Sequence, residues 1–316
     1  MRYIDEHVGS REDGGLRWGV ESICTELTKL GCKIAPATYY EHTGRRPTAR
    51  EIRDEELKPM IAKVHESNYG VYGARKVWLT LNRQRPEDAA PIARCTVERL
   101  MGELGLVGAV RGKVKRTTIS DPRQPKPADR VNRNFAPLAP DRLWVADFTY
   151  CSTWSGWCYT AFVIDAYARR ILGWSVATTM TSQLVLDAVE QAIWTRSREG
   201  RELSGLVAHH DHGVQYMSVA YSERLDAAGI KPSTGAVGSS YDNALAESIN
   251  GLYKTELVKR RGPWKGVDDL EIATAEWVDW YNHRRTFEYC DDLTPVEAEA
   301  AHYDHHKDPA TVGSSN

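Results

Sequence analysis

Long hydrophobic stretches are missing from this sequence of 316 residues. No apolar run approaches the roughly 18 residues that a membrane-spanning helix needs. The first residues, MRYIDEHVGSRED, are also too polar for a secretory signal peptide. We therefore expect an intracellular, cytoplasmic protein without a membrane partner.

Cysteine is scarce, and no two cysteines have the spacing of a metal-binding or redox pair. The six cysteines are Cys24, Cys32, Cys95, Cys151, Cys158 and Cys290, and they form no CxxC pair. This spacing does not match a zinc site or a disulfide framework. We expect free thiols in a reducing compartment.

An excess of charge of either sign is also absent, because the whole chain carries a net charge of −2. Taken alone, this value argues weakly against a nucleic-acid-binding protein. The two halves differ, however. Residues 1–140 hold 25 Lys and Arg against 18 Asp and Glu, a net +7, whereas residues 141–316 hold 16 against 25, a net −9. A basic first half favours phosphate binding and an acidic second half favours metal binding, with chance asymmetry in a soluble enzyme as the alternative.

The first half of the chain is helical in pattern. Residues 1–16 are polar and predicted to be a loose arm; helices are expected at 17–30, near 34–40, and at 50–66, 73–82 and 91–104. The last helix starts with Pro91 in its first turn and has an apolar face of Val97, Leu100, Met101 and Leu104. Its outer face carries Arg94, Thr96 and Arg99, as in a helix-turn-helix whose final helix reads the major groove. A purely structural three-helix spacer is the alternative.

A basic segment follows these helices. Arg111, Lys113, Lys115 and Arg116 place four positive charges within six residues, with no apolar period. Between a DNA-reading module and a catalytic domain, such a run is expected to follow phosphates. Residues 119–140 contain five prolines and are predicted to be an extended connector.

From residue 141 the pattern changes to α/β. Strands are expected at 143–151, 157–167, 170–178, 205–211 and 230–234, and helices at 181–198, 217–228 and from about Ser240 onward. Three antiparallel strands followed by alternating helices and strands are typical of the ribonuclease H-like fold. In that fold the centre of the first strand, the end of the fourth strand and the late helix converge. These places hold Asp147, Asp211 and Glu247.

The late helix has two distinct faces. At about 100° per residue, one stripe holds Asn243, Glu247, Asn250 and Lys254, and the opposite side holds Leu245, Ile249 and Leu252. Glu256 falls on the packing side, so the helix is expected to end or to leave the core there. A basic loop at 259–265 and a helix at 267–282 follow.

Five motifs in a fixed order carry a family resemblance. They are Trp144-x-x-Asp147-x-Thr149-Tyr150, His210-Asp211-x-Gly213-x-Gln215-Tyr216, Asp242-Asn243-Ala244-x-Ala246-Glu247-Ser248, Lys254-Thr255-Glu256 and Tyr281-Asn282-x-x-Arg285. Over about residues 60–300, this pattern resembles the retroviral-integrase-like DDE transposases of bacterial insertion sequences. More narrowly, it resembles the OrfB-type transposase encoded in the second reading frame of a large insertion-element family.

The resemblance implies a function and a site. It implies a transposase that binds the terminal inverted repeats and a target in double-stranded DNA, cleaves a strand to expose a 3′-OH, and transfers that strand. Asp147, Asp211 and Glu247 are expected to hold two Mg²⁺ or Mn²⁺ ions about 4 Å apart, with Lys254 at a phosphate near the cut. It further implies at least a homodimer on DNA, a fusion to or partnership with the upstream-frame product, and a bacterial, nucleoid-associated location.

Further DNA contacts and domain limits complete the prediction. His210 and Asn243 are expected to position the site and to contact DNA. Arg284 and Arg285, after the helix at 267–282, are expected to contact DNA at the ends of the element. The expected domains are 1–48 (helical), 49–110 (helix-turn-helix), 111–140 (linker), 141–262 (core), 263–302 (helical extension) and 303–316 (tail), with residues 302–316 unstructured. A catalytically silent DNA-binding regulator of the same fold is one alternative. A glycoside hydrolase with paired carboxylates, prompted by the ten tryptophans, is the other.

Overall fold

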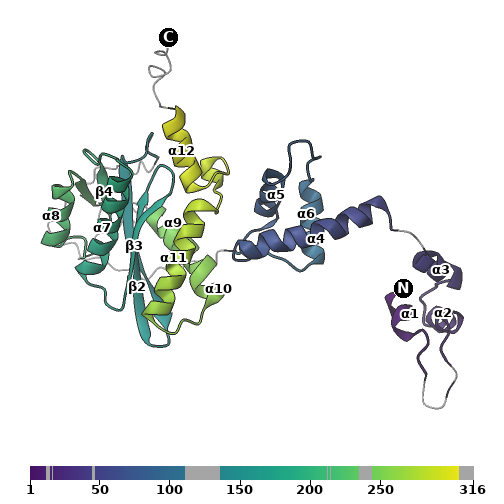
Figure 1. Ribbon diagram of the computed structural model, residues 1–316. Helices are drawn as coiled ribbons and strands as arrows, with labels where there is room; N and C mark the ends of the chain where they lie inside the picture. Colours follow the sequence, from purple (N-terminus) through teal and green to yellow (C-terminus); the bar gives the residue numbers. More distant parts are fainter. Residues whose placement is uncertain are drawn as a thin grey trace, which may run out of the picture. The chain divides into compact units, whose positions relative to one another are not determined.

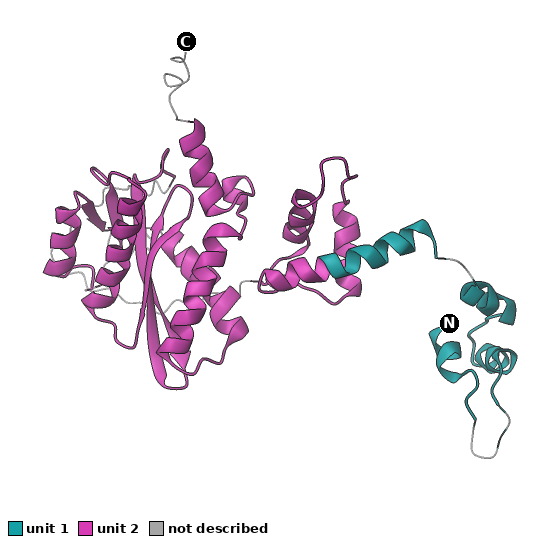
Figure 2. Ribbon diagram, viewed as in Figure 1, with its two compact units in different colours: residues 1–60 teal, residues 61–316 magenta. Residues whose placement is uncertain are grey.

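The computed structural model describes residues 1–11, 15, 17–44, 47–110, 136–211, 213, 215–234 and 244–305. The chain forms two compact units, Met1–Met60 and Ile61–Asn316, and the boundary falls inside helix α4 (Figure 2). Several predicted positions lie outside the described residues: Arg111, Lys113, Lys115 and Arg116 of the basic segment, Asn243, and the expected start of the late helix near Ser240.

The first unit contains a small helical core. Its helices are α1 (Arg2–His7), α2 (Val20–Lys29), α3 (Pro36–Gly44) and the first part of α4 (Ala49–Ser67). Ile4 of α1 is fully buried against Ile23 and Tyr39, and the Tyr39 hydroxyl donates to Asp5 at 2.8 Å. The predicted loose arm is therefore wrong for residues 2–7, because one buried side chain fixes this helix in the core.

The second unit begins with the end of α4, followed by α5 (Ala74–Arg83) and α6 (Arg94–Glu103). The helix predicted to begin at Pro91 begins at Arg94 instead. Ile92 explains the difference: its backbone N–H donates to Asn82 Oδ1 at 2.8 Å, and its carbonyl accepts from Trp78 Nε1 at 2.7 Å. Side chains of α5 thus satisfy the backbone just before α6 and keep it out of the helix.

A five-stranded mixed sheet forms the centre of the second unit (Figure 1). Its strands are β1 (Leu143–Thr153), β2 (Gly156–Asp165), β3 (Ile171–Ala177), β4 (Val207–His210) and β5 (Lys231–Thr234), in the order β3-β2-β1-β4-β5. The first three strands pair antiparallel, while β4 runs parallel to both β1 and β5. This is the ribonuclease H-like arrangement that the sequence predicts.

Helices cover both faces of the sheet (Figure 1). On one face lie α7 (Ser182–Arg198) and α8 (Val219–Ala227); on the other lie α9 (Ala244–Tyr253) and α11 (Val267–His283). Trp144 and Ala146 of β1 belong to the apolar core under α7 and α8. Because side chains alternate along a strand, Asp147 points to the α9 face. There Phe162, Tyr253 and Trp277 pack with their ring centroids 5.1–6.0 Å apart.

Four more elements follow α9 in the described part of the chain: the π-helix η1 (Lys254–Val258), α10 (Lys259–Arg261), the 3₁₀ turn η2 (Glu288–Cys290) and α12 (Pro295–His305). Two predictions are corrected here. The basic loop at 259–265 begins with a helical turn, and residues 302–305, expected to be unstructured, are the last turn of α12.

The segment around α5 is joined to α11 and to the chain after it by polar contacts. Arg75 forms two 2.7 Å hydrogen bonds with Asp292, and the Tyr72 hydroxyl donates to the carbonyl of Arg284 at 3.1 Å. Trp280 Nε1 donates to Asn68 Oδ1 at 3.0 Å. These contacts fix the helices that precede the sheet against the C-terminal extension of the same unit.

Candidate active site

The position of Asp147 follows from the register of the sheet. The parallel pairing of β1 with β4 ends at Ala146 opposite His210. Asp147 is the next residue of β1, which continues to Thr153, and Asp211 directly follows β4, so both lie where the β1–β4 pairing ends. Because neighbouring strands are about 5 Å apart, the sheet brings these two acids to the same level although 64 positions separate them in sequence.

Asp147 is enclosed by protein but retains some solvent exposure. Its Oδ1 accepts from the Phe148 backbone N–H at 2.9 Å, and its Oδ2 accepts from Asn250 Nδ2 at 2.9 Å. Burial raises the pKa of Asp147 well above its ordinary value, and the negative charges of Asp211 and Glu247 raise it further. The two hydrogen bonds act in the opposite direction but do not balance these effects.

Glu247 lies in the first turn of α9 and is exposed, whereas Asn250, one turn later, is buried. Asn250 Oδ1 has no hydrogen-bond partner within the described part of the chain. The sequence placed Asn250 on the stripe of Glu247 but assigned it no role. The three-residue spacing from Glu247 was the available signal for its contact with Asp147.

The three acids lie near one another but do not form a compact metal-binding cluster. Among the residues that the structure describes, no three Asp, Glu, His or Cys side chains are grouped closely enough to hold a metal ion. Asp211 and Glu247 are nevertheless near enough to Asp147 to raise its pKa. Carboxylate oxygens are the ligands that Mg²⁺ and Mn²⁺ prefer, and a cation would relieve this repulsion, so the residues fit such an ion.

Lys254 begins η1, directly after α9, and its Nζ lies 4.5 Å from the ring centroid of Tyr150. Tyr150 is on β1, three residues beyond Asp147. The junction of α9 with η1 therefore presents Glu247, Asn250 and Lys254 along β1. Single π-helical turns inside α-helices occur frequently at functional sites.

Comparison with protein families matches this architecture. The chain matches integrase core domain models over residues 137–240 and 228–295, and an HTH-like domain model over residues 51–114. It is 63% identical over 278 residues to a protein of insertion sequence element IS986/IS6110 from Mycobacterium tuberculosis, covering 88% of this chain and 99% of that protein. The transposase for insertion sequence element IS629 from Shigella sonnei is 49% identical over 292 residues, covering 91% of this chain and 93% of that one. The chain belongs to the transposases of bacterial insertion sequences.

Among solved structures, the HTLV-2 integrase catalytic core domain in complex with magnesium is similar to this transposase with 20% identity and a TM-score of 0.40. The match covers 51% of this chain and 98% of that one. In the described residues of the transposase, no helix is long and apolar enough to cross a membrane.

Two predicted DNA contacts of the transposase are corrected by burial. His210 is almost fully buried; its ring stacks on Tyr216 at 4.7 Å, and its Nδ1 donates to the Asp211 carbonyl at 2.8 Å. Arg285 is buried as well, and its guanidinium bonds Glu256 at 2.6–3.2 Å. Neither side chain can reach a phosphate. His210 supports the backbone beside Asp211, and Arg285 holds η1.

The remaining predicted DNA contacts lie on the surface of the transposase. Arg94 pairs with Glu98 at 2.8 Å and Arg99 with Glu103 at 2.6 Å, each one turn along α6. Thr96 is half-buried, and Arg284 is largely exposed, 3.6 Å from Asp279. Exposed ion pairs contribute little to stability, so these guanidiniums can exchange a carboxylate for a phosphate at small cost. These four contacts stay predictions.

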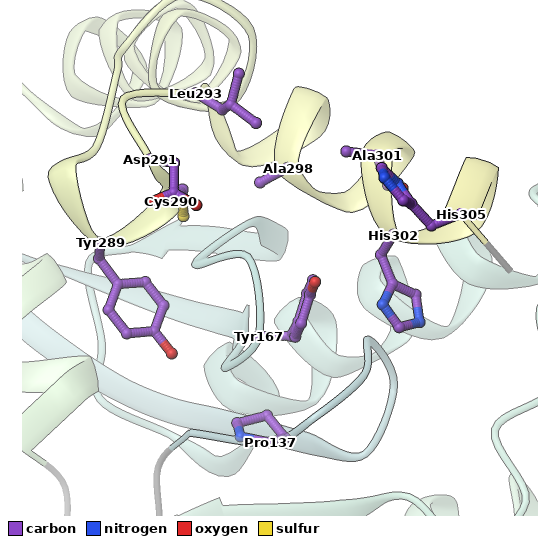
Figure 3. Close-up of a pocket in the computed structure, with 10 residues that line it drawn as sticks. All are labelled: Pro137, Tyr167, Tyr289, Cys290, Asp291, Leu293, Ala298, Ala301, His302 and His305. Carbon is purple, nitrogen blue, oxygen red and sulfur yellow. The ribbon is translucent and has the colours of Figure 1, made fainter.

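A pocket of about 450 Å³ lies between α12, η2 and the turn after β2 (Figure 3). Tyr167, Tyr289, Cys290 and His302 are among its lining residues. Tyr167 follows the end of β2 that pairs with the start of β1, since Asp165 is opposite Trp144. The pocket is therefore near the amino end of β1, and its lining residues do not include Asp147 or Asp211.

Proposed function

We propose that this transposase cleaves and joins DNA strands at Asp147, Asp211 and Glu247. One observation carries the proposal: the register of β1 and β4 brings Asp147 and Asp211 together where the pairing of these strands ends, and Glu247 adds a third negative charge there. Three carboxylates that repel one another are unfavourable in a metal-free protein. They are the expected ligands of hard divalent cations in phosphoryl transfer.

Each residue of the site has a separate role in this proposal. Asp147, Asp211 and Glu247 would hold two Mg²⁺ or Mn²⁺ ions. Such ions, when bound, help to deprotonate the attacking hydroxyl and to stabilise charge on the phosphate and the leaving oxygen. Asn250 fixes the orientation of the Asp147 carboxylate through Oδ2. Lys254 donates to a phosphate oxygen next to the cut, as a charge-assisted hydrogen bond.

DNA binding is assigned to the first part of the chain. The HTH-like region presents Arg94, Thr96 and Arg99 on α6, and we assign this face to the terminal inverted repeats of double-stranded DNA. The site at the end of the β1–β4 pairing receives the strand end and the target DNA. Pairing of two element ends requires at least a dimer, with an upstream-frame product as a further partner or fusion. The protein acts at the nucleoid in the bacterial cytoplasm.

One observation favours a second candidate, a catalytically silent DNA-binding regulator of the same fold. The acids of the described residues do not form a ready-made metal group. In that case Asp147 would be a remnant, and DNA binding would persist without cleavage. Metal-dependent nicking separates the two candidates.

The experiment compares Asp147→Asn with Asp187→Asn in Mg²⁺-dependent nicking of DNA that carries the inverted repeats. Asp187 is an exposed aspartate of α7 that accepts from Gln183, so it controls for the same chemical change elsewhere. We expect Asp147→Asn to lose nicking activity but to retain the DNA gel shift. Asp187→Asn should remain active. Asn250→Ala should reduce nicking about 10- to 100-fold, as loss of a residue that orients a metal ligand does. Full activity of Asp147→Asn would refute the proposal.

A further inference from the structure

Three large aromatic side chains at the β1–β2 hairpin have no role in the site described so far. Tyr150 is 48% exposed, Trp157 is 56% exposed and Trp154 is 73% exposed. Burial of a large aromatic ring gains much free energy, so exposed rings are unfavourable, and a group of them on a surface is typical of a binding site.

Tyr150 and Trp157 form a defined pair. Their ring centroids are 5.4 Å apart with an interplanar angle of 79°. Tyr150 is opposite Tyr159 in the register, and Trp157 is opposite Ser152, so the two rings are diagonal neighbours on one face of the hairpin. Tyr159 packs against the apolar core, whereas the outer two rings extend beyond it and remain about half exposed.

The pair is linked to the candidate active site through Lys254. Because side chains alternate along β1, the Tyr150 ring is on the face opposite the Asp147 carboxylate. Lys254, which follows Glu247 by two helical turns, nevertheless has its Nζ 4.5 Å from the Tyr150 centroid. A base attached to a phosphate that Lys254 binds is therefore within reach of Tyr150 and Trp157.

We propose that Tyr150 and Trp157 form a stacking platform for an unpaired base of the bound DNA strand. This proposal rests on the proposed strand cleavage at Asp147. A nucleobase offers a flat apolar face to the rings, and Lys254 neutralises the phosphate attached to it. The base must be unpaired, because the faces of a base inside a duplex are covered by its neighbours. The platform would hold the opened strand end next to the cut.

Affinity measurements with the full chain test the platform. Fluorescence anisotropy in Ca²⁺ buffer compares DNA with unpaired terminal bases and the same DNA with abasic sites there. Trp157→Ala should weaken binding to the first DNA roughly 5- to 150-fold, the range that base–aromatic stacking gives, and Tyr150→Ala should act likewise. The affinity of wild type should fall by the same factor when the terminal bases are replaced by abasic sites. The affinities of the two variants should not fall further on the abasic DNA.

Two further variants keep the result interpretable. Trp157→Phe retains an aromatic face and should retain most of the affinity. Trp154→Ala changes a more exposed tryptophan of the same hairpin, and its ring makes no stacking contact within the described residues, so binding should be unchanged. Equal losses for Trp154→Ala and Trp157→Ala, or no dependence on the abasic sites, would overturn the platform. A change in oligomeric state without an abasic effect would instead assign the rings to a protein contact and also overturn it.

The platform and the proposed function can fail separately. Mg²⁺-dependent cleavage by wild type is measured on the same DNA. If wild type cleaves and Trp157→Ala binds normally, the platform is wrong and the function stands. If wild type does not cleave but the abasic effect is present, the platform stands as a DNA-binding surface and the catalytic proposal fails.

Discussion

The buried ion pair between Glu256 and Arg285 gives a prediction with a calculable size. The two side chains are only 6% and 8% exposed, and three hydrogen-bond contacts of 2.6–3.2 Å join them. Burial opposes the charge of Arg285, but Glu256 outweighs it and raises the pKa of the guanidinium. The Arg285 guanidinium carbon also lies 4.2 Å from the Phe287 ring centroid.

Arg285→Met leaves Glu256 as an unpaired buried carboxylate. Breaking a buried pair in this way costs about 3–5 kcal/mol, and little solvent is present to screen that cost here. The total stability of a domain is about 5–15 kcal/mol, so the loss is a large fraction of it. The double variant Glu256→Leu/Arg285→Met removes both charges and should recover most of the loss.

Urea denaturation followed by tryptophan fluorescence measures these differences. All tryptophans except Trp18 belong to residues 61–316, so the signal reports mainly on the second unit. We expect Arg285→Met to be the least stable variant and the double variant to lie near wild type. Because Lys254 is in the same π-helical turn as Glu256, Arg285→Met should also weaken DNA binding at temperatures where it stays folded. A loss below about 1 kcal/mol, the range of a surface pair, would refute this account.

Three further substitutions give predictions about packing and pH. Burial, and to a smaller extent Arg285, lower the pKa of Lys76 from 10.5 to about 7. Between pH 7 and pH 10.5 the unfolded chain binds a proton that the folded chain does not. The unfolding free energy should therefore rise with pH from about 7 to about 10.5. Urea titrations at several pH values should show a smaller rise for Lys76→Met than for wild type. Gly173→Ala would place a Cβ 2.0 Å from the Ala188 carbonyl oxygen, so thermal denaturation should show a destabilisation of about 1–3 kcal/mol or more. The exposed helical Gly102 has open space around it, so Gly102→Ala should instead stabilise α6 by about 0.5–1 kcal/mol; equal effects of the two changes would contradict the close approach of β3 to α7.

Periodicity predicted most of the second unit because its strands and helices bury one continuous face each. All five strands and α7, α8 and α11 occur within a few residues of their predicted limits. The errors arise where one side chain overrides the local pattern. Ile4 fixes α1 in a core, and Asn82 with Trp78 keeps Ile92 out of α6.

The site was predictable as a set of positions but not as a set of contacts. The motif order pointed to Asp147, Asp211 and Glu247, and strand register then explains why the first two meet where the β1–β4 pairing ends. The pairing of Glu256 with Arg285 joins residues 29 positions apart across an unpredicted π-helical turn. Exposed arginines and paired arginines look alike in a sequence, and only burial separates Arg285 from Arg284.

Manganese binding tests the central claim most directly. Mn²⁺ is titrated into the full chain bound to an element-end DNA and followed by electron paramagnetic resonance, for wild type and for Asp147→Asn, Asp211→Asn and Glu247→Gln. We predict two bound ions in wild type, with binding weakened by each of the three substitutions and unchanged by Asp187→Asn. Undiminished Mn²⁺ binding by Asp147→Asn would show that the three acids do not form one metal site.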